Sequence, residues 1–446
     1  MNAGLSQSDC AAYSVLFAQG EAARAGEPAW LRVARQSAFA SFVGVGWPTS
    51  KQEEWRFTDP SQLTSALVQL AGSEAASGAP TFDEILRGLG RGIGHRLGFV
   101  DGRHATEHAR DGSLPRGLVL APLAQAMQDP AARLDALLGQ ALREPSAFVA
   151  LNTAFLQDGA VVRIPAGLVV EAPIILAYLA ATPERASLPR TVVHAGADSQ
   201  ATIVELHLGA DGRATLANAV TEILLEPGAR LGYYAVQRPS PTGCHVGHLA
   251  VVQRRGSGLR AHSLTLAGRL VRNDAHVELA EEGCSCQLDG LYLAGSGSHL
   301  DNQTSIDHRA PRCTSRESYR GVVARHGQAV WSGRAVVRPE AQGTDARQTN
   351  RNLLLAEEAI VHAKPHLQIF ASDVKCSHGA TSGRLDPEAL FYMRTRGIGE
   401  RDAHQMLVAA FLREGLGAVT EPGLHGELEA VLSHRARELL AEGAAA

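Results

Sequence analysis

The sequence predicts a mainly β protein, in which a parallel β-helix lies between two helical regions. Between about residues 136 and 383, short runs of alternating apolar and polar residues dominate, and helical periodicity is nearly absent. Several runs recur at about thirty residues, the length of one coil of a solenoid. A β-sandwich would place strands about every 8–12 residues, so a stack of coils explains this region better.

The first region, residues 1–135, is predicted to be helical. Pro28 suits the first turn of a helix, and apolar residues recur at helical spacing over residues 30–39. A polar and aromatic loop follows at residues 46–58. The segment 74–112 has many glycines and little periodicity, so we expect irregular structure there.

The central region, residues 136–383, is predicted to hold the coils of the β-helix. Turn signals such as Pro227-Gly228 precede or separate its apolar runs, as expected where a coil changes direction. The clearest strand-like runs are residues 201–208, 259–266, 275–279, 328–332 and 359–363.

The last region, residues 384–446, returns to helical patterns. Asp386 and Pro387 predict a helix start, and Gly397 predicts its end. These helices must bury their apolar stripes, either against the β-helix as a cap or against a partner, and the pattern leaves both open. The stripes are Ala403, Met406, Leu407, Ala410 and Phe411, ended by Gly415, and then Leu428, Val431, Leu432 and Leu439.

Composition limits the classes of function. A chain of 446 residues is long enough for two or three domains, and a net charge of -4 argues against a dedicated nucleic-acid surface. We see neither a run of eighteen apolar residues nor a secretion leader, so we expect no membrane span and a cytoplasmic location. Six scattered cysteines do not make a disulfide scaffold, and free thiols fit a reducing compartment.

The segment from Lys364 to Thr381 is the most informative part of the chain. Cys376 and His378 lie two residues apart after a strand-like run, so on an extended strand their side chains share one face. A thiol beside an imidazole is a common start for a site that holds iron, zinc or a sulfur species. The chain has three lysines, and two of them, Lys364 and Lys375, lie here. A buried cysteine and a core histidine would explain the same pattern without a site.

Other clusters have simpler explanations. Cys284 and Cys286 would share one face of a strand, but buried cysteines that bind no metal explain them better. The run Gly243 to His248, with Cys244 and His245, reads as a surface loop. One further run is basic, and we interpret it as a solvated face. It consists of Arg309, Arg312, Arg316 and Arg320. We find no phosphate-binding loop, no H-E-x-x-H, no G-x-S-x-G and no C-x-x-C motif.

Four segments, in order along nearly the whole chain, match one family. Residues 48–58 are similar to an N-terminal P-x-x-x-x-E-x-W-R/K-Y/F-T signature, with Glu53 or Glu54 and Trp55. Residues 148–160 open the β region. The most specific segments are residues 348–381, which contain K-C-S-H-G-A-T, and residues 390–399, L-F-Y-M-R-T-R-G-I-G. The sequence resembles the SufB/SufD family of iron–sulfur cluster assembly proteins, and within it the SufD branch.

The resemblance implies a right-handed parallel β-helix between helical ends. It also implies a non-catalytic scaffold subunit of the SufBCD complex. This subunit would pair with SufB through the β-helix and bind the SufC ATPase through its C-terminal helices. The residues that we expect at the SufC contact are Phe391, Tyr392, Arg394, Arg396, Gly397, Met406 and Phe411.

The resemblance assigns His378, as a metal ligand, and its neighbour Cys376 to a site where a transient iron–sulfur cluster forms at the SufB interface. SufB has a cysteine within the segment that matches Asn350–Asn352 and a glutamate at the position of Gly379. This chain has neither, which indicates SufD and implies that it cannot hold a cluster alone. We therefore expect no tightly bound cofactor in the isolated chain, which could form a homodimer when SufB is absent.

Two other classes of function fit parts of the sequence. One is a stand-alone metal-binding protein with a closed site. The other is a β-helix carbohydrate-active enzyme, which would usually carry a secretion leader and a groove of carboxylates, and neither stands out. Tightly bound metal in the purified chain would favour the first class. The closed site would consist of Cys284, Cys286, Cys376 and His378.

Overall fold

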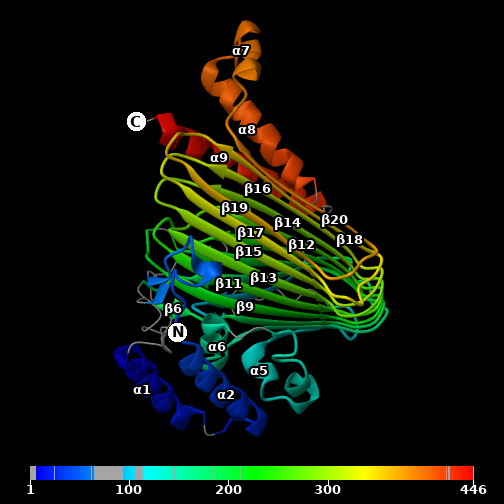
Figure 1. Cartoon of the computed structure of the whole chain (residues 1–446). Coiled ribbons are helices and arrows are strands. Elements are labelled where there is room, and N and C mark those ends of the chain that lie inside the picture. Colours follow the sequence, from blue (N-terminus) through cyan, green and yellow to red (C-terminus); the bar gives the residue numbers. More distant parts are fainter. Residues whose placement is uncertain are drawn as a thin grey trace.

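The computed structural model describes residues 7–24, 26–61, 63–64, 94–105, 114–143, 146–183, 185–210, 212–417, 419 and 422–444. Two sheets of mostly parallel strands face each other and are wound from successive parts of the chain (Figure 1). Each coil adds one strand to each sheet, so the core is a parallel β-solenoid flanked by helices, as the sequence predicts.

Sheet 1 is defined here by ten strands in the spatial order β2-β1-β5-β8-β10-β12-β14-β16-β18-β20. Only its β1–β2 pair is antiparallel among the described strands. The bounds are β1 His95–Val100, β2 Arg103–His104, β5 Ile174–Ala180, β8 Gln200–Gly209, β10 Arg230–Arg238, β12 Gly258–Thr265, β14 Ser285–Ala294, β16 Thr314–Val323, β18 Thr344–Leu354 and β20 Val374–Gly383.

Sheet 2 follows the order β19-β17-β15-β13-β11-β9-β7-β4-β3, and the short β6 pairs with β9. Its antiparallel pair among the described strands is β3–β4. The bounds are β3 Val119–Pro122, β4 Gly159–Ile164, β6 Ala186–Ser187, β7 Arg190–Ala195, β9 Leu216–Leu225, β11 Cys244–Gln253, β13 Leu270–Leu279, β15 His299–His308, β17 Gln328–Val337 and β19 Ile360–Ile369.

The core lies between the two sheets and is built of columns of inward-facing side chains. Because the parallel strands stack in register, each inward residue lies directly above its counterpart in the previous coil. Val271 and Val277 of β13 belong to this core, as does the fully buried Trp331 of β17. The coils turn through left-handed backbone at positions such as Gly228, which helps to explain the glycine-rich composition.

Helices at the N-terminal end of the chain pack against the side of the first coils (Figure 1). An aromatic cluster around Tyr13, Phe42 and Trp47 joins these helices to apolar residues of sheet 2, including Leu270. The predicted helix over residues 30–39 is confirmed as part of α2. The helical bounds are α1 Gln7–Ala23, α2 Ala29–Val45, η1 Glu53–Trp55, α5 Leu123–Ala126, η3 Pro130–Ala132, η4 Leu134–Ala136 and α6 Ala147–Ala154.

Two local predictions were wrong. Part of the segment 74–112 is not irregular, because β1 and β2 lie within it, while residues 74–93 and 106–112 are outside the described residues. The β1 strand is stabilised by parallel pairing with β5, a contact that local periodicity cannot show. The run Gly243–His248 is not a surface loop, because β11 begins at Cys244 and is buried in the centre of sheet 2.

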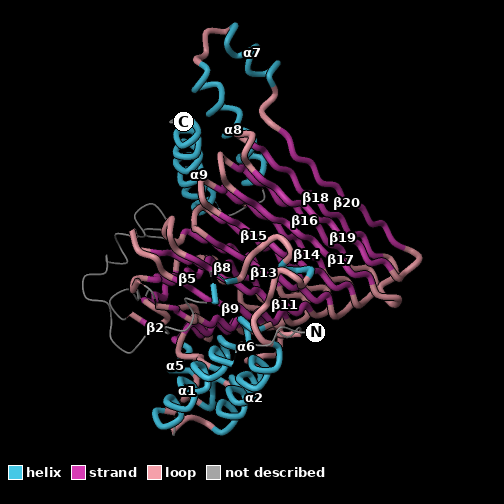
Figure 2. Tube along the Cα trace, turned by 60° about the vertical axis from the view of Figure 1, so that its left-hand side comes forward, coloured by secondary structure: helices cyan, strands magenta, loops and turns pink. Residues whose placement is uncertain are grey.

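The C-terminal helices are α7 Pro387–Thr395, α8 Glu400–Leu416 and α9 Pro422–Ala444. Asp386 caps α7 by accepting a hydrogen bond from the Glu388 amide at 2.9 Å, as predicted. The helices α8 and α9 cover the outer face of sheet 1, whereas α7 projects beyond the solenoid (Figures 1 and 2). Packing against the β-helix therefore accounts for two of the three helices, but these two cover the face of a sheet and do not cap the last coil.

The buried stripe of α8 differs from the predicted one. It consists of Ala403, Val408, Leu412 and Leu416, while Met406 is exposed. Gly415 does not end the helix. A Cβ atom there would lie 2.4 Å from a methyl carbon of Leu291, so this glycine lets α8 approach β14 closely.

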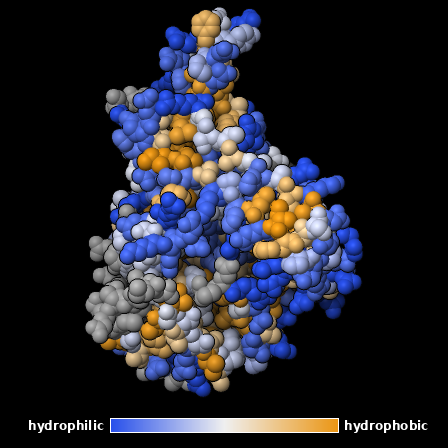
Figure 3. Space-filling view, in the orientation of Figure 1, coloured by the Kyte–Doolittle hydropathy of each residue, from blue (hydrophilic) through white to orange (hydrophobic). Residues whose placement is uncertain are grey.

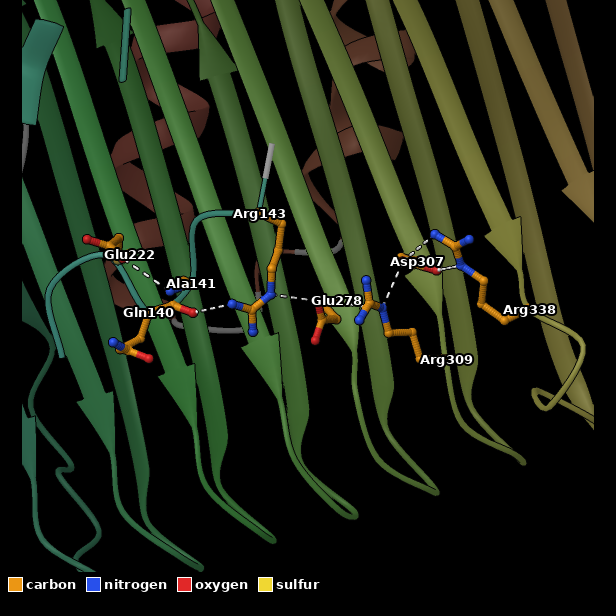
Figure 4. Close-up of polar contacts among 8 residues, drawn as sticks. All are labelled: Gln140, Ala141, Arg143, Glu222, Glu278, Asp307, Arg309 and Arg338. Atoms are coloured by element: carbon orange, nitrogen blue, oxygen red, sulfur yellow. Dashed lines mark hydrogen bonds and ion pairs between the residues drawn. The ribbon is translucent and has the colours of Figure 1, made fainter. Parts of the chain in front are cut away.

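A polar network fixes residues 139–143 to the outer face of sheet 2 (Figure 4). The Glu222 carboxylate accepts hydrogen bonds from the Gly139 amide at 2.9 Å and the Ala141 amide at 3.2 Å. The same carboxylate pairs with Arg190, and neither side chain is exposed. Further along the sheet the network continues through Arg143, Glu278, Arg309, Asp307 and Arg338.

Candidate functional site

The candidate site lies on the last coil of the solenoid, which consists of β19 and β20. Among the described strands, β20 has a single neighbour, β18, and β19 has a single neighbour, β17. Both strands are much more exposed than those before them. Apolar side chains are also exposed here, namely Ile360, Ile369 and Phe370. The solenoid therefore ends in an open coil that offers strand edges and apolar surface.

Cys376 and His378 lie on the inward side of β20. In the register, Cys376 pairs with Ala346 and His378 with Gln348, and both of these β18 residues are buried. The predicted shared face is therefore confirmed. His378 is exposed and Cys376 is half-buried, because no further described coil covers them. The alternative of a core histidine is excluded by this exposure.

The Cys376 thiol lies at the edge of a small apolar cluster with Val337, Ala341 and Ala371. Burial, with a smaller effect of the nearby Asp345 carboxylate, raises its pKa, although a hydrogen bond with the Ala346 backbone opposes the shift. A thiol with a raised pKa stays protonated at neutral pH, so an iron ion that binds it must displace the proton.

A column of polar side chains leads from His378 into the solenoid. Gln348 lies beneath His378 in the register and donates a hydrogen bond of 2.9 Å to the carboxylate of Glu317. Glu317 lies one coil deeper, is 2% exposed and also accepts a hydrogen bond from Thr304. Burial raises the pKa of Glu317 to about 7. The Gln348 Oε1 atom is buried and has no hydrogen-bond partner among the described residues.

Replacing Glu317 with glutamine is expected to make the protein less sensitive to rising pH. The pKa of Glu317 is raised on folding, so between about pH 4.5 and 7 the native state keeps a proton that the unfolded chain has lost. Stability therefore falls through that window in the wild type. Across this pH window, the free energy of unfolding of the variant should rise by about 3 kcal/mol relative to that of the wild type. Urea denaturation at pH 5 and pH 8 measures this, and parallel pH profiles would contradict it.

The two lysines of the segment do not join the cysteine and the histidine. Lys364 lies on the outer face of sheet 2, where it forms an ion pair with Glu53. Lys375 alternates with Cys376 along β20 and is exposed on the opposite side of the strand. The structure therefore places the two lysine side chains away from the side chains of Cys376 and His378, although all four residues are close in sequence.

The signature at residues 48–58 binds across the outer face of sheet 2. Trp55 stacks on Phe148, and the guanidinium of Arg272 lies 3.8 Å from the centre of its indole ring. The Thr58 hydroxyl donates a 2.6 Å hydrogen bond to Asp301. Near the open end, Phe57 stacks on His362 at 4.1 Å. The signature thus spans from the central coils to β19.

A groove of about 560 Å³ lies between this signature and sheet 2. Its walls include the signature itself and outward residues of five successive strands of sheet 2. Most are polar, and they include His248, His276, Arg334, Lys364 and His366. The groove reaches the last coil but opens on the opposite side of the sheet from the inward-facing core.

The expected partner-binding residues divide into two groups. Phe391 and Tyr392 on α7 are 70% and 59% exposed, and Met406 on α8 is 53% exposed. Figure 3 shows hydrophobic surface at this projecting tip among hydrophilic residues. The exposed group also includes Arg394, Arg396 and Gly397. Phe411 differs, because it is half-buried against sheet 1 with Arg320 above its ring.

The closed four-ligand metal site is not supported by the geometry. Cys286 and Cys376 lie in one inward column but are three strand spacings apart, or about 14 Å. Two sulfur ligands of one zinc ion lie within about 5 Å of each other. In the described part of the chain, no group of three or more His, Cys, Asp or Glu side chains is placed to hold a metal ion.

Two further features differ from the sequence interpretation. Arg320 is not on a solvated face, because it is only 13% exposed and pairs with Glu414 of α8. Cys284 precedes β14 and lies beside Cys313, which precedes the next strand of the same sheet, β16. Only the register reveals this second pair, because the two residues are a full coil apart in sequence.

Comparison with protein families places the chain clearly. Residues 178–411 match the SUF system FeS cluster assembly, SufBD core domain, and residues 7–176 match the SufBD protein N-terminal region. None of the described helices is long and apolar enough to cross a bilayer.

Curated relatives agree over most of the chain. An iron–sulfur cluster assembly SufBD family protein of Synechocystis is 30% identical over 411 residues, which cover 90% of both chains. The iron–sulfur cluster assembly protein SufD of Escherichia coli is 28% identical, over 90% of this chain and 92% of SufD. The chloroplastic protein ABCI7 of Arabidopsis thaliana is 29% identical, over 84% of this chain and 80% of ABCI7. The chain therefore belongs to the SufB/SufD family of iron–sulfur cluster assembly proteins and is most like SufD.

Proposed function

We propose that this chain is a cytoplasmic, non-catalytic scaffold subunit that pairs with SufB and binds the SufC ATPase. In this role it contributes His378 to a site where an iron–sulfur cluster is built as cargo. One observation carries the proposal. The His378 and Cys376 side chains are accessible at the open end of the solenoid, beside strand edges that another chain can cover.

The SufB contact is assigned to the last coil. The strands β19 and β20 present edges, and strand edges are templates for pairing with another sheet. Exposed Ile369 and Phe370 add apolar area next to them. A partner that covers this coil would enclose His378 and could add the remaining ligands. The same surface could serve a homodimer when SufB is absent.

The SufC contact is assigned to the projecting tip. No residue of the α7 helix is buried, whereas α8 and α9 bury apolar residues against sheet 1. Phe391 and Tyr392 are large aromatic side chains flanked by Arg394 and Arg396, a composition typical of interface hot spots. Phe411 would then act by fixing α8 to the solenoid rather than by direct contact.

Co-purification of the chain with its own SufB and SufC tests the proposal. Phe370→Asp is expected to weaken SufB binding by about thirtyfold or more, because it places a charge in an apolar contact, and to leave SufC bound. Phe391→Asp is expected to have the converse effect. Each variant is the control for the other, since both change an exposed phenylalanine. The assignment would be refuted if one variant lost both SufB and SufC. It would also be refuted if both variants still bound both partners.

A further inference from the structure

Two buried cysteines form a pair that the cluster site does not use. Ser285 of β14 pairs with Thr314 of β16, so the residues just before them, Cys284 and Cys313, also lie side by side. The Thr314 amide donates a 2.9 Å hydrogen bond to the Cys284 carbonyl oxygen, which fixes this alignment. Adjacent strands are about 4.8 Å apart, and Cα atoms joined by a disulfide are usually about 4.4–6.8 Å apart.

The two sulfur atoms converge on one point. The Cys284 thiol lies 3.0 Å, and the Cys313 thiol 3.3 Å, from the same carbonyl oxygen, that of Glu281. Both side chains are almost fully buried, at 1% and 0% exposed. The shared carbonyl oxygen therefore places the two sulfur atoms close together in the interior.

Electrostatics favour one thiolate in this pair. The neighbouring Cys284 thiol lowers the pKa of the Cys313 thiol. The backbone amides of Cys284 and Gly283 act in the same direction, and burial opposes them. A thiolate is the form that reacts with peroxides and disulfides. Cys286 has no such neighbour, because Leu259 and Ser315 flank it in its column.

We propose that Cys284 and Cys313 are a redox-active dithiol, which a small peroxide such as hydrogen peroxide converts to a disulfide between two successive coils. The Cys313 thiolate attacks one peroxide oxygen, the O–O bond breaks, and a sulfenic acid and hydroxide form. The Cys284 sulfur then attacks the sulfenic sulfur and expels the oxygen as water. In total, two thiols lose two electrons and two protons, and the peroxide becomes two water molecules.

Peptide mapping of the full-length protein tests the proposal. The reduced protein is treated with hydrogen peroxide, the free thiols are alkylated, and the chain is digested with trypsin. Cleavage after arginine separates residues 273–309, which contain Cys284 and Cys286, from residues 313–316, which contain Cys313. The expected product is these two peptides joined, two hydrogen masses lighter than their sum, and separated again by dithiothreitol.

Three serine variants make the assignment specific. Cys284→Ser and Cys313→Ser are each expected to abolish the joined peptide, and Cys286→Ser, the matched buried control, to leave its yield unchanged. Circular dichroism confirms that each variant is folded. A link through Cys286, sulfinic or sulfonic acid at Cys313 without a link, or both thiols still free when Cys376 is fully oxidised would each overturn the proposal.

Discussion

Replacing His378 with alanine is expected to lower the yield of assembled cluster by about tenfold to a hundredfold and to leave folding and complex formation unchanged. The reasons are the position and exposure of the ring. His378 faces inward at the open end of the solenoid and is exposed, so its loss removes no core packing. Changes around metal ligands commonly cost about ten- to a hundredfold in affinity, and loss of a ligand should cost at least as much. The measurement is the visible absorbance of the cluster on the purified complex.

A matched control is available in the same coil. His366 is also an exposed histidine, but it lies on β19 and faces the outer side of sheet 2. His366→Ala should therefore form complexes and assemble clusters as the wild type does. Full cluster assembly by His378→Ala, or an equal loss in both variants, would show that the imidazole of His378 is not a ligand. Loss of SufB binding by His378→Ala would instead assign the residue to docking.

Much of the architecture follows from local patterns in the sequence. The strand-like runs at residues 201–208, 275–279 and 328–332 all lie within strands, because alternation along a strand is a local property. The strand β1 was missed because its stability comes from pairing with β5, some eighty residues away. The buried stripe of α8 was placed on the wrong face for a similar reason. Its position depends on the outer face of sheet 1, to which Gly415 gives close access.

In the candidate site, too, local features could be predicted from the sequence and contacts between coils could not. A spacing of two residues placed Cys376 and His378 on one face, and the register confirms it. Neighbours from other coils could not be predicted, since they depend on stacking. Gln348 and Glu317, which lie beneath His378, come from earlier coils. Lys364 forms an ion pair with Glu53, over three hundred residues away. The Cys284–Cys313 pair was missed for the same reason, because a period near thirty does not fix which residues align.

Replacing Glu222 with alanine is expected to lower the free energy of unfolding by about 3–5 kcal/mol, a large loss for a single substitution. Glu222 and Arg190 are both fully buried and form an ion pair. Removing the carboxylate leaves the guanidinium charge buried, with only the neutral oxygens of Asn152 and Thr153 to accept its hydrogen bonds. The Gly139 amide also loses its acceptor, and so does the Ala141 amide (Figure 4).

The measurement is urea denaturation followed by circular dichroism, with hydrogen exchange at residues 134–143 as a local readout. The matched control is Glu282→Ala, which breaks the exposed pair with Arg312 and should cost less than about 1 kcal/mol. A double variant, Arg190→Met with Glu222→Leu, removes both charges together and should recover part of the loss. If Glu222→Ala and Glu282→Ala cost the same, the buried pair does not anchor this segment. A large loss confined to Glu222→Ala, with faster exchange at residues 134–143, would show that one buried carboxylate joins the N-terminal region to the solenoid.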